Sequence, residues 1–173
     1  EYLTIPNPLD GEYKIETQGT GSGEYTVATG YISDDISVDK DYTAQTAPGL
    51  ETTLNLTVNN LNPTDIEIVP ADTAPPEIAI TSPQPKDYLR SEILPINVNV
   101  SDTESGVFSQ TIKFDDRIVN NGSSVDLFFE MLGAHKVTAN AVDFVGNPAN
   151  KEVAFRVVAT IQSTISDIER AYS

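Results

Sequence analysis

Apolar and polar residues alternate in short runs along most of this chain, and turn residues separate the runs. Residues 96–100 place Ile96, Val98 and Val100 on alternate positions with Asn between them, and residues 137–141 repeat the pattern. Successive side chains of a β-strand point to opposite faces, so this alternation predicts strands with one buried face. Eleven prolines and ten glycines interrupt the runs. The sequence therefore predicts an all-β protein with frequent turns.

The strongest break in the pattern is "VPADTAPPEIAI" at 69–80, where Pro70, Pro75 and Pro76 oppose any strand pairing. We place the boundary between two domains there. The sequence predicts an N-terminal β domain over 1–70, which is small for a closed sandwich and need not be complete. A proline-rich linker over 71–76, a β-sandwich over 77–159 and an amphipathic helical tail over 160–173 follow.

The segment 77–159 contains seven predicted short strands, which is the strand count of an immunoglobulin-like sandwich. The predicted fold class is all-β: an immunoglobulin-like β-sandwich preceded by a smaller β-sandwich-like domain, with a short C-terminal helix. The residues predicted to point into the sandwich are Ile96, Val98, Val100, Val125, Leu127, Phe129, Val137, Ala139, Ala141, Val153, Phe155 and Val157.

The tail changes period. Ile161, Ile165, Ile168 and Tyr172 follow the spacing i, i+4, i+7, i+11, which puts them on one face of a helix. Two arrangements would cover this apolar stripe: packing on the sandwich, or, as we favour, a helical region that continues in a larger parent protein.

The net charge of −16 and the sequence pI of about 4.1 limit the kinds of partner that this chain can bind. Ten Lys and Arg residues scattered along the chain argue against binding to nucleic acid or to anionic membranes. No apolar run is long enough for a transmembrane helix, so no membrane insertion is expected. The chain has no cysteine, which excludes disulfides and thiolate chemistry and favours an exported prokaryotic protein over a eukaryotic one.

Two predicted strands end in Asp followed by a glycine turn, "VSDTESGV" at 100–107 and "AVDFVGN" at 141–147. In a sandwich the loops after these strands emerge at one end, which would bring Asp102 and Glu104 near Asp143 and Asn147. Carboxylate and amide oxygens 2.3–2.6 Å from one centre are what Ca²⁺ requires. Three interpretations remain open: a calcium site, turns that Asp and Asn cap by bonding their own backbone, and a direct binding loop.

No set of residues predicts catalysis. His135 is the single histidine, so a catalytic triad or a histidine-rich metal site cannot be assembled. The adjacent pairs Asp34/Asp35 and Asp115/Asp116 would point to opposite faces of a strand and cannot flank one glycosidic bond. We therefore expect that the chain is not an enzyme, and that calcium is the only cofactor to consider.

The second domain also resembles a known family. "DTAPPEIAITSP", "VSDTESGV", "IKFDDRIV", "GAHKVTANAVDFVGN" and "VAFRVV" are similar to the bacterial immunoglobulin-like (Big-type) domains of exported and cell-surface proteins, over about residues 73–159. The resemblance implies a spacer, an adhesion module or an accessory domain, and some related domains bind calcium at domain edges. "LDGEYKIETQGTGSGEYTV" in the first domain is similar to accessory β-sandwich domains of secreted hydrolases.

Taken together, these patterns predict a non-catalytic structural or interaction module, a spacer or adhesion domain, of an exported or cell-surface prokaryotic protein. The alternative is an accessory domain of a secreted hydrolase whose catalytic domain lies outside this chain. Expected partners are neighbouring domains of a larger parent protein and protein or glycan ligands. Tyr2, Tyr13, Tyr25 and Tyr31 would favour glycan binding if they formed an exposed strip, and would be structural if they packed in the core or at its edge.

Overall fold

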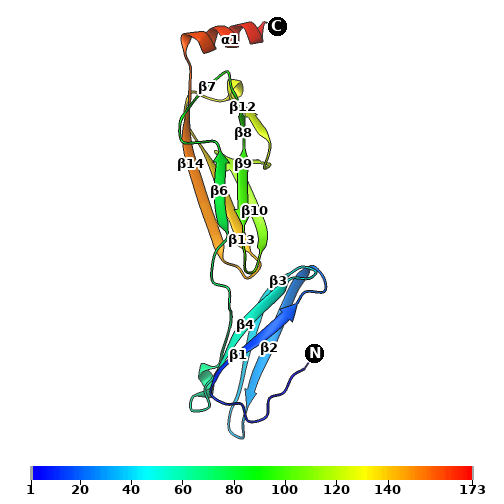
Figure 1. The fold of residues 1–173 in the computed structure, drawn as a ribbon. Helices are drawn as coiled ribbons and strands as arrows, with labels where there is room; N and C mark the ends of the chain where they lie inside the picture. The colour runs from blue at the N-terminus through cyan, green and yellow to red at the C-terminus, as the bar shows by residue number, and fades with distance from the viewer. Residues whose placement is uncertain (1, 173) are drawn as a thin grey trace. The chain divides into compact units, whose positions relative to one another are not determined.

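The computed structural model describes residues 2–172, which form two compact units. The first unit runs to Ala74 and includes the loop Phe144–Asn147; the second comprises Pro75–Asp143 and the chain from Pro148 onward. Strands dominate both units, and α1 (Ile161–Ala171) is a short helix at the C-terminal end (Figure 1). The predicted fold class is confirmed.

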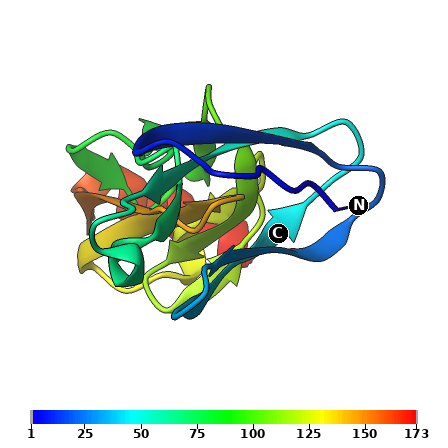
Figure 2. The same cartoon turned by 90° about the horizontal axis from the view of Figure 1, so that it is seen from below.

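The first unit consists of two small antiparallel sheets. Its elements are β1 (Gly11–Gln18), β2 (Gly23–Ile32), β3 (Ser37–Thr46), β4 (Glu51–Val58), the 3-10 helix η1 (Pro63–Asp65) and β5 (Glu67–Pro70). One sheet has the order β1-β4-β5 and the other pairs β2 with β3. Figure 2 shows the dark-blue β1 and the lighter-blue β2 in separate sheets. The buried apolar side chains of this unit are Leu54, Val58, Ile66 and Ile68.

The second unit is a two-layer sandwich. Its strands are β6 (Glu77–Ser82), β7 (Asp87–Leu89), β8 (Ile93–Pro95), β9 (Asn97–Ser101), β10 (Val107–Phe114), β11 (Arg117–Val119), β12 (Ser124–Asp126), β13 (Gly133–Asp143) and β14 (Pro148–Val158), with a 3-10 helix η2 (Leu127–Phe129). One layer is a five-stranded sheet with the order β11-β10-β13-β14-β7, in which β7 pairs with β14 in parallel. The other layer contains the pairs β6-β9 and β12-β8.

A side chain joins these two pairs into one layer. Beyond β8 and β12 the ladder continues through Ile96, whose N–H donates to the Ser123 carbonyl and whose carbonyl accepts from the Gly122 N–H, both at 2.8 Å. At the next rung the Asn121 side chain replaces a backbone peptide: its Oδ1 accepts from the Val98 N–H at 2.9 Å and its Nδ2 donates to the Val98 carbonyl at 2.8 Å. Strand topology and layering are those of an immunoglobulin-like sandwich.

The core lies between the two layers. The apolar residues predicted to point inward are buried at Ile96, Val98, Val125, Leu127, Val137, Ala139, Ala141, Phe155 and Val157, while Val100 and Val153 are partly buried against them. The aromatic rings of Phe114 and Phe155 meet edge to face with centroids 5.8 Å apart. The period-two pattern therefore predicted the buried face of this unit correctly in nearly every strand.

Phe129 is the exception, because it is 76% exposed rather than buried. The segment after β12 is not a strand: Asp126 accepts a hydrogen bond from the Phe128 N–H at 3.1 Å and starts η2. A 3-10 helix has three residues per turn, so alternate residues no longer share a face and Phe129 turns outward. The described residues of the second unit form nine strands where seven were predicted, because the second predicted strand divides into β8 and β9 and the short strand β7 was not predicted.

The predicted C-terminal helix is present as α1, but its apolar stripe is not buried on the sandwich. Ile161 is 85% exposed, Ile165 44%, Ile168 54% and Tyr172 90%. Arg170 pairs with Asp126, and its guanidinium lies 5.1 Å from the centroid of the Phe128 ring. Ser173, the last residue of the predicted tail, lies outside the described residues. Among the described residues, no helix has the length and apolar character to cross a membrane.

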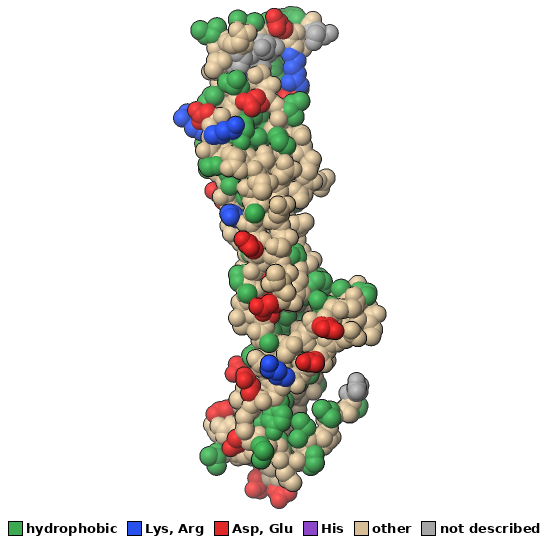
Figure 3. Space-filling view, in the orientation of Figure 1, with side chains coloured by type: hydrophobic (Ala, Val, Ile, Leu, Met, Phe, Trp, Pro, Cys, Tyr) green, Lys and Arg blue, Asp and Glu red, His purple; other side chains and the backbone are tan. Residues whose placement is uncertain are grey.

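Acidic side chains are spread over the surface. Figure 3 shows, on the face it presents, isolated Asp and Glu side chains along the chain and fewer Lys and Arg. On that face the acidic side chains do not gather in a single patch.

Candidate metal centre

Strand register brings Asp102 and Asp143 together within the second unit. Asp143 is the last residue of β13, and Val107, the first residue of β10, pairs directly with it. The loop that carries Asp102 connects the end of β9 to Val107. The β10–β13 pairing therefore fixes how closely the 102–106 loop approaches the end of β13. Carboxylate oxygens of Asp102 and Asp143 lie within 4.8 Å of one another.

This spacing fits a divalent cation. Two oxygens that are each 2.3–2.6 Å from one Ca²⁺ ion are at most about 5 Å apart. Asp143 is 1% exposed and Asp102 is partly buried. Two carboxylate charges at this separation repel by about 3 kcal/mol at an effective dielectric constant of 20. A cation between them would replace the repulsion with attraction.

The same residues also form a well-made turn. Oδ1 of Asp102 accepts hydrogen bonds from the backbone N–H groups of Glu104, at 3.1 Å, and Gly106, at 2.7 Å. Gly106 has φ of 78° and Gly146 has φ of 100°, a backbone region that favours glycine. Turn capping by Asp102 is thus observed. Because Ca²⁺ takes six to eight oxygen ligands, a capping carboxylate with a second oxygen remains able to bind the ion.

The other two predicted ligands are placed differently. Glu104 is exposed, and among the described acidic residues it does not share the close carboxylate grouping of Asp102 and Asp143. Asn147 is partly buried in the loop Phe144–Asn147, and its Nδ2 donates to the Ala74 carbonyl at 3.4 Å. Of the three predicted acidic ligands, the structure therefore brings Asp102 and Asp143 together.

Asp72 is an acidic residue that the sequence patterns did not single out. It lies in the proline-rich linker and is only 7% exposed, and its Oδ1 accepts from the Ala74 N–H at 2.9 Å. A buried carboxylate is uncommon in a linker, since burial of a charge is costly. The one sequence feature that could have indicated a buried Asp72 is its position between Pro70 and Pro75. An acidic residue exposed to solvent is just as common in such a linker.

Asp115 and Asp116, one of the two carboxylate pairs considered for catalysis, lie in a turn that they help to form. Asp115 and Asp116 form the turn between β10 and β11, where Asp115 has φ of 50°. Asp115 bonds to the ring of His135 at 2.8 Å and to the Lys136 N–H at 3.0 Å. His135 is therefore held inside the fold by its neighbours.

The four tyrosines do not make a flat aromatic strip. Tyr2 is fully exposed, but Tyr13, Tyr25 and Tyr31 are partly buried. Tyr25 meets Tyr42 edge to face with centroids 6.4 Å apart, and the Tyr31 hydroxyl donates to Asn60. The Tyr13 hydroxyl donates to the Leu9 carbonyl. These contacts are those of residues at the edge of a small core.

Comparisons with known proteins assign no family to this chain. No family model matches it, and no curated protein matches it. Among solved structures, the chain is similar to one described as "Structures of Clostridium thermocellum CbhA fibronectin(III)-like modules", at 14% identity and a TM-score of 0.41. That match covers 90% of this chain and 94% of the other. The fold assignment given above rests on the sheet topology itself.

Proposed function

We propose that this chain is a non-catalytic structural module of an exported or cell-surface prokaryotic protein, where it acts as a spacer or adhesion domain. The observation that carries the proposal is the connection between the two units: residues 71–76 contain neither helix nor strand, and Pro75 and Pro76 end the segment. Consecutive prolines favour an extended, semi-rigid path, so the linker suits a spacer that holds its neighbours at a set reach. Its partners would be neighbouring domains of the parent protein and protein or glycan ligands.

The absence of cysteine allows a direct test of the linker. Spin labels on Lys14→Cys and Lys151→Cys, both exposed positions on strands of different units, would report a distribution of label distances. The double change Pro75→Gly, Pro76→Gly should broaden that distribution, because glycine removes the restriction on φ. Pro6→Gly, near the N-terminus, is the matched control. An equally broad distribution in the unchanged protein and the double variant would refute the spacer function.

The accessory-domain alternative rests on the likeness of residues 9–27 to domains of secreted hydrolases. It predicts that the isolated chain sediments with an insoluble polysaccharide, while a spacer stays in the supernatant. The tyrosine contacts described above favour the spacer, because a carbohydrate-binding surface needs aromatic faces that are free to stack on sugars.

We further propose that Asp102 and Asp143 bind Ca²⁺, which would stiffen the end of the sandwich from which their loops emerge. Thermal unfolding in millimolar Ca²⁺, against EDTA and with Mg²⁺ as a control, tests this. A site at 100 times its Kd adds about 2.7 kcal/mol to the free energy of unfolding. Asp102→Asn and Asp143→Asn should each abolish the calcium response, since asparagine keeps the shape of the side chain and removes the charge.

Glu104→Gln completes the set of variants. It should leave the calcium response intact, because the exposed Glu104 side chain lies outside the close pair of Asp102 and Asp143. If Ca²⁺ does not raise the melting temperature of the unchanged protein, and the variants melt in the same way with and without Ca²⁺, the calcium proposal is wrong. Asp102 is then a turn residue, and its replacement by Ala costs about 1 kcal/mol, as for other side-chain caps.

A further inference from the structure

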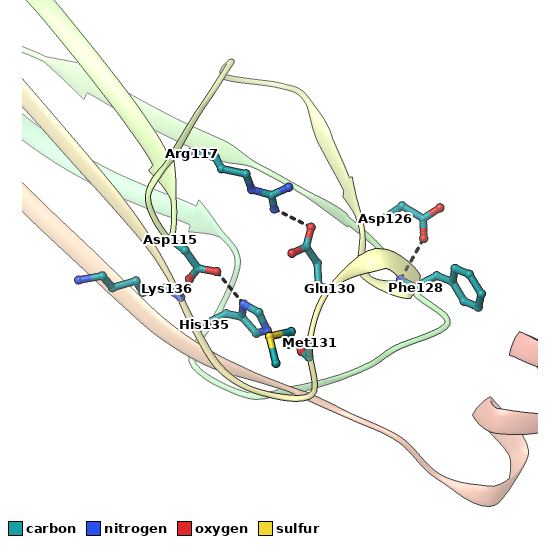
Figure 4. Close-up of polar contacts among 8 residues, drawn as sticks. All are labelled: Asp115, Arg117, Asp126, Phe128, Glu130, Met131, His135 and Lys136. Atoms are coloured by element: carbon teal, nitrogen blue, oxygen red, sulfur yellow. Dashed lines mark hydrogen bonds and ion pairs between the residues drawn. The ribbon is translucent and has the colours of Figure 1, made fainter.

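The single histidine has an unusual pair of partners. His135 is the third residue of β13 and is 8% exposed. Its Nδ1 lies 2.8 Å from Oδ2 of Asp115, in the turn between β10 and β11, and its Nε2 lies 2.7 Å from the Met131 carbonyl oxygen. Figure 4 shows the ring between these two groups, which come from opposite sides.

Both partners are acceptors. A backbone carbonyl can only accept, and an ionised carboxylate can only accept. A neutral imidazole carries one N–H and would leave one of the two contacts without a proton, while an imidazolium donates to both. The geometry is therefore that of a doubly protonated ring. The rings of Phe114 and Phe155, with centroids 5.5 and 5.8 Å from that of His135, flank it and offer further attraction to a cation.

The charged groups around the ring favour the same state. Burial lowers the pKa of His135. The hydrogen bonds from the ring to the Met131 carbonyl and to Asp115, together with the negative charges of Asp115 and Glu130, raise the pKa by more than burial lowers it. The pKa of His135 therefore lies above the ordinary 6.5. Glu130 in turn pairs with Arg117 of β11 at 2.5 Å. On β13 and β14, Lys136 pairs with Glu152 at 2.9 Å, and Asp116 lies near Lys136.

The Met131 contact holds a segment that makes few other hydrogen bonds among the described residues. We call residues 129–132, from the last residue of η2 to the residue before β13, the 129–132 segment. Within it the Glu130 N–H donates to the Leu127 carbonyl at 3.2 Å and Glu130 pairs with Arg117. The Phe129 ring lies 5.1 Å from that of Phe128 and 5.9 Å from the Arg170 guanidinium. Three of its side chains are apolar and exposed: Phe129 at 76%, Met131 at 81% and Leu132 at 52%. The hydrogen bond from His135 thus ties a segment with little apolar burial to the core strand β13.

We propose that His135 is a proton-dependent latch: in its doubly protonated form it holds the 129–132 segment against β13, and loss of a proton at higher pH releases that segment. Asp115 keeps its bonds to the Lys136 backbone in either state, so it remains in place and favours the tautomer with the proton on Nδ1. The contact that is lost is the one between Nε2 and the Met131 carbonyl.

Because the chain has one histidine, its ring protons give a single unambiguous NMR titration. The expected result is a titration above pH 6.5 and, over the same pH range, faster amide exchange of Glu130, whose N–H donates to Leu127 and loses protection when the segment is released. The exchange rate should rise roughly three- to tenfold after correction for the intrinsic rate, as expected for loss of one hydrogen bond. Exchange of Leu94 and Val137, in the core, should not change.

Two variants separate the latch from a general effect of pH. Asp115→Asn should move both the ring titration and the change in exchange to lower pH together. Glu152→Gln, which removes the exposed ion pair on β14, is the control and should move neither. If the exchange of the 129–132 segment is constant across the ring titration in the unchanged protein, or if it changes at a pH unrelated to that titration, the latch is refuted. The measurement on the unchanged protein decides this even if Asp115→Asn does not fold.

Discussion

The replacement Asn121→Ala gives the sharpest test of how the second layer of the sandwich is held together. Both polar groups of this side chain bond to the backbone of Val98, at 2.9 and 2.8 Å, and extend the ladder between β12 and β8 by one rung. Alanine keeps the backbone of the turn and removes both bonds. The Val98 N–H and carbonyl then lose their partners next to a side chain that is 1% exposed.

The expected loss follows from those two groups. Each hydrogen bond contributes about 0.5–1.5 kcal/mol net, and a buried polar group left without a partner costs about 1–3 kcal/mol. We take about 3 kcal/mol for the pair, because the groups lie where the turn meets the layer and water can reach part of them. For a domain of about 100 residues, a loss of this size lowers Tm by about 12 °C.

Urea unfolding followed by calorimetry measures this loss. Asn120→Ala is the matched control, because the Ser123 hydroxyl donates to the backbone carbonyl of Asn120, which alanine keeps. Asn121→Asp keeps an acceptor for the Val98 N–H but removes the donor, so its effect should fall between the control and Asn121→Ala. A free energy of unfolding for Asn121→Ala within about 0.5 kcal/mol of the unchanged protein would show that the side-chain rung contributes nothing to the layer.

Two further predictions concern a close contact and a titration. A Cβ on Gly19 would lie 2.1 Å from the Ala47 carbonyl oxygen, so Gly19→Ala should destabilise the first unit by about 2 kcal/mol or more, whereas Gly21→Ala, with nothing within 4 Å, should be neutral in urea unfolding. Because the pKa of His135 is raised in the folded state, its stabilisation is complete below about pH 6.5 and is lost as the pH rises through the folded-state pKa. Unfolding free energies measured from pH 6 to 9 should therefore fall less for His135→Gln than for the unchanged protein, and equal slopes would contradict the assignment.

The sequence predicted most of the second unit because its strands obey one simple rule. Alternation identified Ile96, Val98, Val137 and Phe155 as buried, since a strand with one face on a core must place alternate residues on that face. The rule failed at Phe129, where the backbone leaves the strand for a 3-10 turn that Asp126 begins. A capping bond of this kind spans two residues and leaves no trace in the hydrophobic pattern.

Contacts between distant residues were beyond that rule. The bond pattern of Asn121 depends on β9 lying beside the 120–123 turn, and the partners of His135 depend on two loops meeting at one ring. Asparagine in a turn and histidine at the start of a strand each have several ordinary roles. Only the packing of the layers selects one of them.

The candidate calcium ligands divide in the same way. The sequence by itself determined that Asp102 and Asp143 each lie where a strand gives way to a glycine turn, because Asp caps turns and glycine adopts positive φ. The tertiary structure decided that these two carboxylates lie within 4.8 Å of one another, while Glu104 remains outside that group. The pairing of Val107 with Asp143 sets this distance, and strand register depends on the burial of whole faces rather than on the residues at the ends.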